Sequence, residues 1–459
     1  MTLRSRNLSD FCFVKLALTL LVGPVKPSVY LFFVGLKCKD VEEILIATNS
    51  MNYSDLVKPT TVADDEYFQA LTAHMREYDP VPYIESETHK SFWVATKHAD
   101  IIEIERQNEK FLNTQNSVLM RREIEEQVAA AGTGPALRTL INMDEPDHRK
   151  FRDLTRDWFL PANLKPVERR VKELAVRAVD DMLELGEEID FVKDVAAWYP
   201  LRVIMMILGV PEEDLPLMLR LTQELFGADD PDMRREAETE EQRMQTLIEF
   251  YTYFNKMTQD RRNRPGDDVA SVIANAQIDG EQIGDLEAMS YYVIIATAGH
   301  DTTSSSTAGG LLALIQHPDE FKKIQNNPEI SQLAVDEAIR WVSPVKHFLR
   351  YATEAYELRG KRIKQGDALM MLYPSGNRDE EVFENADRFI ADRRPNRHLA
   401  FGHGAHHCLG NLLAKMEMKH LYEELFSRVS SIELNGEPKL IQSTFVSGLK
   451  TLPVRVKAK

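Results

Sequence analysis

Apolar residues recur with helical spacing along most of the chain after Met51. The longest such segment, Glu281 to Gln316, is apolar on nearly every side, which predicts a helix that runs through the interior. A second long segment, Pro166 to Leu185, stops at Gly186, a residue type that commonly closes helices. Shorter helices are predicted over His98–Arg106 with Thr96 as the N-cap, over Leu201–Leu208 and over Leu409–Phe426.

Alternating apolar and polar positions mark a smaller set of strands. Pro80–Ser86 and Ser91–Ala95 read as two short strands around a polar turn. Strand-like alternation returns between Phe348 and Tyr373, with turns at Arg359–Lys361 and Gln365–Asp367. The pattern therefore predicts a mainly α fold with a small β-rich subdomain.

The first 50 residues differ from the rest. Phe11–Leu36 is rich in apolar residues but contains Lys15, Gly23 and Pro24, and a membrane-spanning helix needs about 20 predominantly apolar residues. We expect residues 1–50 to be an extension, either a non-native start or a weak membrane segment, with an ordered part of the fold as the third reading. No repeat or Pro/Gly/Ser-rich linker interrupts the later chain, so we expect residues 51–459 to form a single domain.

The net charge of −16 disfavours a nucleic-acid partner. The chain has only three cysteines, Cys12, Cys38 and Cys408, which disfavours a disulfide-stapled secreted domain and favours a reducing compartment. We therefore expect a cytoplasmic monomer. Only Cys408 lies beyond the N-terminal segment, so its surroundings decide its interpretation.

The segment Phe401–Gly410, with the sequence FGHGAHHCLG, surrounds that cysteine with glycines and histidines. Its three glycines allow tight turns and the close approach of a flat cofactor. At the start of the predicted helix, the Cys408 sulfur would face unpaired backbone N–H groups, which favour the thiolate, a strong iron ligand. The alternatives are an inert buried cysteine or a zinc site that includes the histidines. Zinc does not explain the glycines, and adjacent histidines would bind one metal with difficulty.

This segment is similar to the haem-binding signature of the cytochrome P-450 family, Phe-x-x-Gly-x-[Arg/His]-x-Cys-x-Gly. The resemblance implies the cytochrome P-450 fold and haem b (iron protoporphyrin IX), with Cys408 as the axial ligand of the iron. The residues that match the signature around Cys408, and are expected to bind the cofactor, are Phe401, Gly404, His406 and Gly410.

A polar break from Ala298 to Thr303 (AGHDTT) interrupts the long apolar helix. Such residues weaken the helical ladder and make room for a ligand or water, and an acid beside an alcohol can pass protons. The simpler alternative is that the hydroxyls bond carbonyls one turn earlier and Asp301 pairs with a structural cation. The break resembles the family's Ala-Gly-x-[Asp/Glu]-Thr motif, which implies that Asp301 and Thr302 are catalytic and manage protons.

Glu337 and Arg340 are three residues apart on one helical face, a spacing that also suits an ordinary surface pair. The resemblance implies instead a buried structural network. In this network a later arginine joins the pair, and we expect Arg388, with Arg394 as the alternative.

The two propionates of haem need cationic or hydrogen-bonding partners. By the resemblance these are His148, Arg152, Arg350 and His406. It also implies that the substrate wall includes Ala298, Val345 and Phe348.

The resemblance extends from Tyr67 to the C-terminus and is bacterial in style, similar to the α-terpineol-hydroxylating and hydrocarbon-hydroxylating group. It implies a monooxygenase that hydroxylates a small apolar substrate with O2, a terpenoid or aromatic hydrocarbon before a sterol. Electrons would pass from NAD(P)H through a ferredoxin reductase and a two-iron two-sulfur ferredoxin. Two rivals would use the same haem site. One is a peroxide-using oxygenase or isomerase, which the Asp301–Thr302 pair disfavours, and the other is a non-catalytic haem sensor or carrier.

Overall fold

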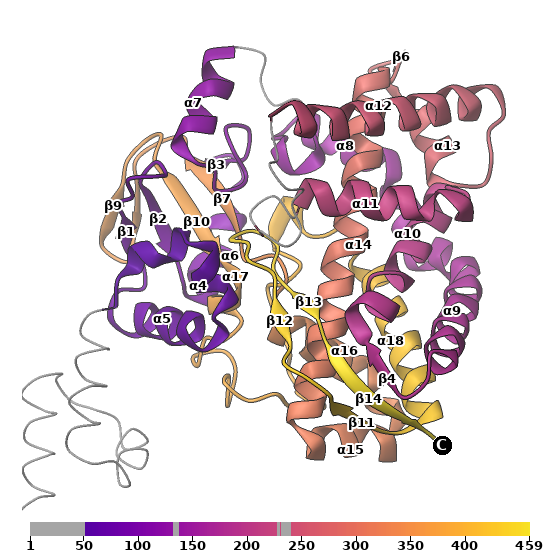
Figure 1. The fold of residues 1–459 in the computed structure, drawn as a ribbon. Coiled ribbons are helices and arrows are strands. Elements are labelled where there is room, and N and C mark those ends of the chain that lie inside the picture. The colour runs from indigo at the N-terminus through magenta and orange to yellow at the C-terminus, as the bar shows by residue number, and fades with distance from the viewer. Residues whose placement is uncertain (1–50, 132–136, 227–229, 231–239) are drawn as a thin grey trace, which may run out of the picture. The chain divides into compact units, whose positions relative to one another are not determined.

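Helices dominate the structure, and a mixed sheet is the main β element (Figure 1). The structure is a computed structural model that describes residues 51–131, 137–226, 230 and 240–459. Tyr53–Lys459 is one compact unit. The fold is therefore mainly α with a small β part, as the hydrophobic pattern predicts. The expectations for residues 1–50 lie outside the described residues.

The helices, with short 3₁₀ or π turns marked η, have the following bounds: η1 Tyr53–Val57, α4 Pro59–Ala63, α5 Asp65–Tyr78, α6 His98–Glu105, α7 Arg122–Ala131, η2 Leu140–Asn142, α8 Asp147–Arg156, η3 Asp157–Phe159, α9 Pro161–Glu184, η4 Val192–Ala196, α10 Tyr199–Leu208, η5 Glu212–Asp214, α11 Leu215–Phe226, α12 Glu240–Asn263, α13 Val269–Ala274, α14 Asp285–Gln316, α15 Pro318–Asn326, η6 Pro328–Ile330, α16 Ser331–Val342, α17 Tyr373–Gly376, η7 Gly404–His406 and α18 Asn411–Arg428.

The strands have the following bounds: β1 Tyr83–Ile84, β2 Phe92–Ala95, β3 Phe111–Leu112, β4 Glu188–Asp190, β5 Gln277–Ile278, β6 Glu281–Gln282, β7 His347–Ala352, β8 Tyr356–Leu358, β9 Lys361–Ile363, β10 Ala368–Leu372, β11 Val429–Leu434, β12 Lys439–Leu440, β13 Leu449–Thr451 and β14 Pro453–Ala458.

The largest sheet has the strand order β1-β2-β10-β7-β3. Strand β10 runs parallel to β2 and antiparallel to β7, so it joins the N-terminal hairpin to the later strands. The apolar side chains of this sheet pack against α6, with Ile101, Ile104 and Leu369 fully buried. The predicted strands before Ala95 and between Phe348 and Tyr373 are confirmed.

The long apolar segment forms the central helix α14, which crosses the middle of the molecule in Figure 1. It packs against α10, α12 and α16, which explains why it has no single polar face. The helix starts at Asp285 rather than Glu281, because Glu281–Gln282 forms strand β6, which pairs with β5 (Gln277–Ile278) in an antiparallel hairpin.

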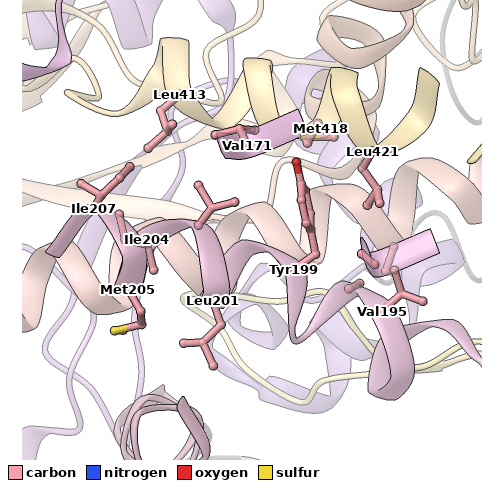
Figure 2. Close-up of a cluster of buried hydrophobic side chains, with 14 of the residues drawn as sticks. Val171, Val195, Tyr199, Leu201, Ile204, Met205, Ile207, Leu413, Met418 and Leu421 are labelled. Carbon is pink, nitrogen blue, oxygen red and sulfur yellow. The ribbon is translucent and has the colours of Figure 1, made fainter. Parts of the chain in front are cut away.

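Helix α10 fills the space between α14 and α9 with apolar side chains (Figure 2). Figure 2 shows Tyr199 directed toward α18, where its hydroxyl donates to the Glu417 carbonyl over 3.0 Å. The helix ends at Gly209, whose φ of 74° is a left-handed conformation that glycine adopts without strain. The predicted end of this helix at Leu208 is confirmed.

Three local predictions are wrong. The N-cap of α6 is Lys97, while the Thr96 hydroxyl donates to the Pro80 carbonyl. Helix α9 begins at Pro161, with Pro166 inside it. Helix α18 begins at Asn411, not Leu409, because the chain from Cys408 to Gly410 forms a turn ahead of the first helical residue.

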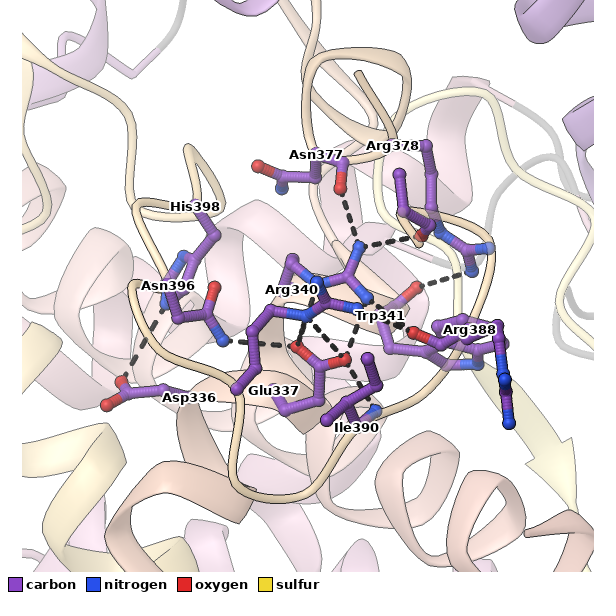
Figure 3. Close-up of polar contacts among 12 residues, drawn as sticks. Asp336, Glu337, Arg340, Trp341, Asn377, Arg378, Arg388, Ile390, Asn396 and His398 are labelled. Carbon is purple, nitrogen blue, oxygen red and sulfur yellow. Dashed lines mark hydrogen bonds and ion pairs between the residues drawn. The ribbon is translucent and has the colours of Figure 1, made fainter. Parts of the chain in front are cut away.

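Glu337 and Arg340 lie fully buried in α16 and bind each other with 2.8 Å contacts, as the resemblance implies (Figure 3). The prediction of Arg388 as the third side chain is wrong, and so is the alternative, Arg394. The guanidinium of Arg393 contacts the Glu337 carboxylate at 3.0 Å, whereas Arg388 supplies only its carbonyl. The network ties α16 to the long loop that precedes the cysteine segment.

Among the described helices, none is both long and apolar enough to cross a membrane.

Candidate active site

A largely apolar cavity brings together segments that are far apart in the sequence. Its wall includes residues of α8, of α14, of β7 and of the segment Phe401–Gly410. The sequence-predicted residues in this wall are His148, Arg152, Ala298, Thr302, Val345, Phe348, Arg350, Phe401, His406, Cys408 and Gly410. The structure thus gathers most of the predicted site into one place. Asp301 and Gly404 are not in the wall, and the Glu337 network is a separate structural feature.

The cysteine segment is held in a tight loop by its own backbone. The Cys408 N–H donates to the Phe401 carbonyl over 2.8 Å, and the Asn411 side chain donates to the Cys408 carbonyl over 2.7 Å. On the other side, the Arg152 guanidinium donates to the His407 carbonyl. These bonds orient the Cys408 side chain without using its sulfur.

Gly404 is needed where the loop meets α6. Its φ is +70°, and a Cβ there would lie 2.2 Å from the Glu105 carbonyl oxygen. A larger residue would therefore push the loop away from α6. The predicted close approach at this glycine is a contact with protein backbone rather than with a cofactor.

Burial raises the pKa of the Cys408 thiol. The N–H groups of Gly410 and Asn411 and the guanidinium of Arg152 lower that pKa, so backbone donors act in the predicted direction, but burial outweighs them. In the described residues, no group of three histidine, cysteine or acidic side chains could hold a metal. The zinc alternative therefore has no support there.

The polar break leaves α14 a continuous helix. Thr302 lines the cavity, and its hydroxyl donates to the Ala298 carbonyl one turn earlier over 2.7 Å. Asp301 lies beside His300 with its side chain 19% exposed, and its buried Oδ2 has no hydrogen-bond partner in the described residues. Burial raises the pKa of Asp301, and His300 lowers it. The simpler alternative was that Asp301 pairs with a structural cation. Among the described residues, no lysine or arginine contacts Asp301.

Two histidines lie against each other at one end of the cavity. The rings of His148 and His406 are 4.0 Å apart. Asn113 Nδ2 lies 3.0 Å from His406 Nε2, and Asp144 in turn holds Asn113. Burial, with Arg350 and the other cations nearby, lowers the pKa of His406 to about 2. Burial also lowers the pKa of His148, so both rings are neutral hydrogen-bonding groups.

Three observations test whether this cavity fits a haem. Gly410 lines it, and a Cβ on Gly410 would meet no heavy atom within 4 Å, which leaves room for a flat group. His148 Nε2 in the wall has no hydrogen-bond partner in the described residues. Arg152 and Arg350 add two cations to a largely apolar wall. A planar apolar group with two carboxylates fits these features.

The residues that sequence reasoning missed are Asn113, Asp144 and Glu105. Asn113 is 293 residues from the histidine that it contacts, so no local pattern could have revealed it. Glu105 is the last residue of α6 and resembles an ordinary helix end in sequence. The apolar wall also includes Ile204, Ile294 and Ile295, whose direction the helical pattern alone does not fix.

Comparison with known proteins adds to this geometry. The family model described as "Cytochrome P450" matches residues 61–458. Cytochrome P450-terp of Pseudomonas sp is 43% identical over 410 residues, which cover 87% of this chain and 96% of that protein. Linalool 8-monooxygenase of Pseudomonas putida is 33% identical over 83% of this chain and 94% of its own length. The crystal structure of CYP108D1 from Novosphingobium aromaticivorans has a TM-score of 0.82 and 41% identity, over 89% of this chain and 98% of that one.

Proposed function

Because the chain belongs to the cytochrome P450 family, we propose that it hydroxylates a small terpenoid with O2, using Cys408 as the axial ligand of its haem iron. Membership of the family makes the chain a monooxygenase with haem b as its cofactor. The observation that carries the proposal is the shared wall of Cys408, Thr302 and Arg152, which come from three separate elements. When bound, the haem activates O2, and thiolate ligation favours cleavage of the O–O bond.

The side chains of this chain have distinct roles in the proposal. The loop bonds around Cys408 hold its sulfur in the cavity wall. Arg152, Arg350, His148 and His406 are placed to bind the cofactor carboxylates. We assign proton delivery to Thr302, which lines the cavity, and to its neighbour Asp301, which lies outside the cavity wall and whose pKa burial raises.

A terpenoid is the favoured substrate class because the wall is apolar and two relatives point the same way. Ile294, Ile295, Ala298, Val345 and Phe348 give a hydrophobic surface with few hydrogen-bond donors. The name of linalool 8-monooxygenase states that this relative acts on linalool, and the name of cytochrome P450-terp contains the abbreviation "terp". Aromatic hydrocarbons and then sterols are the next candidates.

We further propose that a two-iron two-sulfur ferredoxin and an NAD(P)H-dependent reductase supply the electrons. The family match covers nearly all of the unit Tyr53–Lys459, so the described residues of this unit leave no second fold to carry a flavin. Reconstitution with several reductase and ferredoxin pairs tests this step. Product formed with peroxide alone, and unaffected by Thr302→Ala, would contradict it.

The central assignment is tested with purified holoprotein. We expect the reduced protein with CO to give the absorption spectrum of thiolate-ligated haem, and Cys408→Ser to lose that spectrum. Titration with terpene alcohols, aromatic hydrocarbons and sterols should give the largest haem spectral shift with a terpene alcohol. A Cys408→Ser protein that keeps the thiolate spectrum would overturn the assignment, and the absence of any shift across the panel would overturn the substrate class.

A further inference from the structure

Glu105 is a buried acid in the cavity wall whose role the proposed function leaves open. It ends α6, its side chain is 1% exposed, and it lies in the same wall as Arg350. The Tyr373 hydroxyl donates to its Oε1 over 2.6 Å, and Arg350 Nη2 lies 3.3 Å from the same oxygen. Oε2 is buried and has no hydrogen-bond partner in the described part of the chain.

Both side-chain donors reach Oε1 and none reaches Oε2, an arrangement that suits a neutral carboxylic acid better than a carboxylate. In a protonated carboxyl group one oxygen accepts and the other donates. Oε1 already accepts from two groups, so Oε2 is the oxygen left to carry the proton. A buried donor without an acceptor is costly, and the cavity is the side from which an acceptor can come.

The charges of the wall residues also favour a protonated, neutral Glu105. Among the described wall residues the cations are Arg152 and Arg350, which match the two carboxylates of haem b. An ionised Glu105 would add a buried negative charge with no cation left for it, and such groups take up a proton instead.

The direction of the Glu105 pKa agrees. Burial raises this pKa, and Arg350, Tyr373 and the backbone of His403 lower it, with burial the largest cause. Arg350 is already shared, because its other terminal nitrogen donates to the Leu349 carbonyl. One guanidinium therefore cannot fully neutralise both Glu105 and a cofactor carboxylate.

We propose that Glu105 is a neutral carboxylic acid that donates a hydrogen bond from Oε2 to the haem carboxylate held by Arg350. Glu105 is thus a cofactor-binding residue on α6, an element to which no other predicted site residue belongs. The Glu105 carbonyl lies so close to Gly404 that no Cβ fits there, so the end of α6 packs directly against the cysteine loop. The inference rests on the proposed position of the haem carboxylates beside Arg152 and Arg350.

The first test measures haem loss from holoprotein to an excess of a haem-binding apoprotein. Glu105→Leu removes the donor, and we expect haem loss on the order of tenfold faster. Glu105→Gln keeps a neutral side chain with a donor and an acceptor, so it should restore most of the retention. Glu103→Leu on the same helix, at an exposed position outside the wall, is the matched control. Equal rates for wild type and Glu105→Leu would overturn the proposal.

The second test observes the proton directly and needs no leucine variant to fold. Infrared spectra of the holoprotein at neutral pH should contain a carboxylic-acid C=O band that shifts in D2O and is missing from Glu105→Gln. The reduction potential should change little in Glu105→Gln, because no charge is lost. A missing band, or a clear rise in potential, would show an ionised Glu105 and overturn the inference.

A third variant separates this inference from the proposal beneath it. Arg350→Gln should speed haem loss even if Glu105 plays no part. If Arg350→Gln has no effect, the proposed position of the haem carboxylates is wrong. If Arg350→Gln speeds haem loss and Glu105→Leu does not, only the role of Glu105 is wrong.

Discussion

The Nδ1 atom of His300 lies 3.4 Å from the Oδ1 atom of its neighbour Asp301. The other ring nitrogen, Nε2, is 2.8 Å from the Ala197 carbonyl, so it must carry a hydrogen. In a neutral ring Nδ1 is then an acceptor, which would repel a carboxylate. A proton on Asp301, whose pKa burial raises, removes this repulsion, so Asp301 can hold a proton next to Thr302 in the sequence.

Replacing Asp301 should slow proton delivery without changing substrate binding. We expect Asp301→Asn to lower product formation by on the order of 10²-fold and to enlarge the solvent isotope effect. The substrate-induced spectral shift should stay the same, because Asp301 is not in the cavity wall. Asp319→Asn, at a side chain that is 94% exposed, is the control. Wild-type rates in Asp301→Asn would exclude this acid from the proton path.

Breaking the Glu337 network should destabilise the protein strongly. Glu337 accepts from the side chains of Arg340 and Arg393 and from the Ile390 N–H, all within the interior. Glu337→Ala leaves buried cations without a partner, so we expect the free energy of unfolding to fall by about 3–5 kcal/mol. Urea denaturation measures this change. Glu212→Gln, which breaks an exposed pair with Arg177, should leave the midpoint nearly unchanged, and similar losses in both variants would contradict the prediction.

Acid should destabilise the fold through His347. Its Nδ1 is 2.9 Å from the Thr444 carbonyl, and its Nε2 accepts from the Leu119 N–H, an arrangement that only the neutral ring allows. Burial lowers its pKa to about 4, whereas the unfolded chain titrates near 6.5. Between these values the unfolded state binds more protons, so stability falls as pH falls through this window, by about 3 kcal/mol in total.

The measurement is the free energy of unfolding at several pH values between 4 and 8 for wild type and His347→Gln. The variant is expected to be less stable at high pH but to lose less on acidification. Other buried histidines, such as His398, still contribute to its pH dependence. An identical pH profile in both proteins would contradict the assignment to His347.

Gly310 allows α14 to approach its neighbours closely. A Cβ there would lie 2.6 Å from the Ala338 Cβ in α16 and 2.5 Å from the Tyr422 hydroxyl in α18. Alanine would gain about 1 kcal/mol of helix propensity, but overpacking costs typically 1–3 kcal/mol, so we expect net destabilisation of Gly310→Ala. The double variant with Ala338→Gly should recover part of the loss, and purely additive effects in that cycle would exclude the contact as the cause.

The sequence predicted features that depend on local spacing. The apolar course of α14, the stop at Gly209 and the loop around Cys408 follow from residue types and their intervals. The third side chain of the network could not be predicted in this way, because Arg388 and Arg393 have similar local surroundings and only the folded loop decides which guanidinium reaches Glu337. Glu105 was missed for the same reason, since its partners Arg350 and Tyr373 are more than 240 residues away.

The unbroken helix α14 has a practical consequence for protein engineering. Ile294, Ala298 and Thr302 recur at intervals of four along the helix and all line the cavity. His300 does not line it, and its ring contacts the Ala197 carbonyl at the end of η4. A library that varies positions 294 and 298 can therefore reshape the wall while the helix backbone keeps Thr302 and Asp301 in place. Substrate selectivity and proton delivery thus depend on different positions of α14. A designer can change the substrate that is accepted without changing the residues that deliver protons.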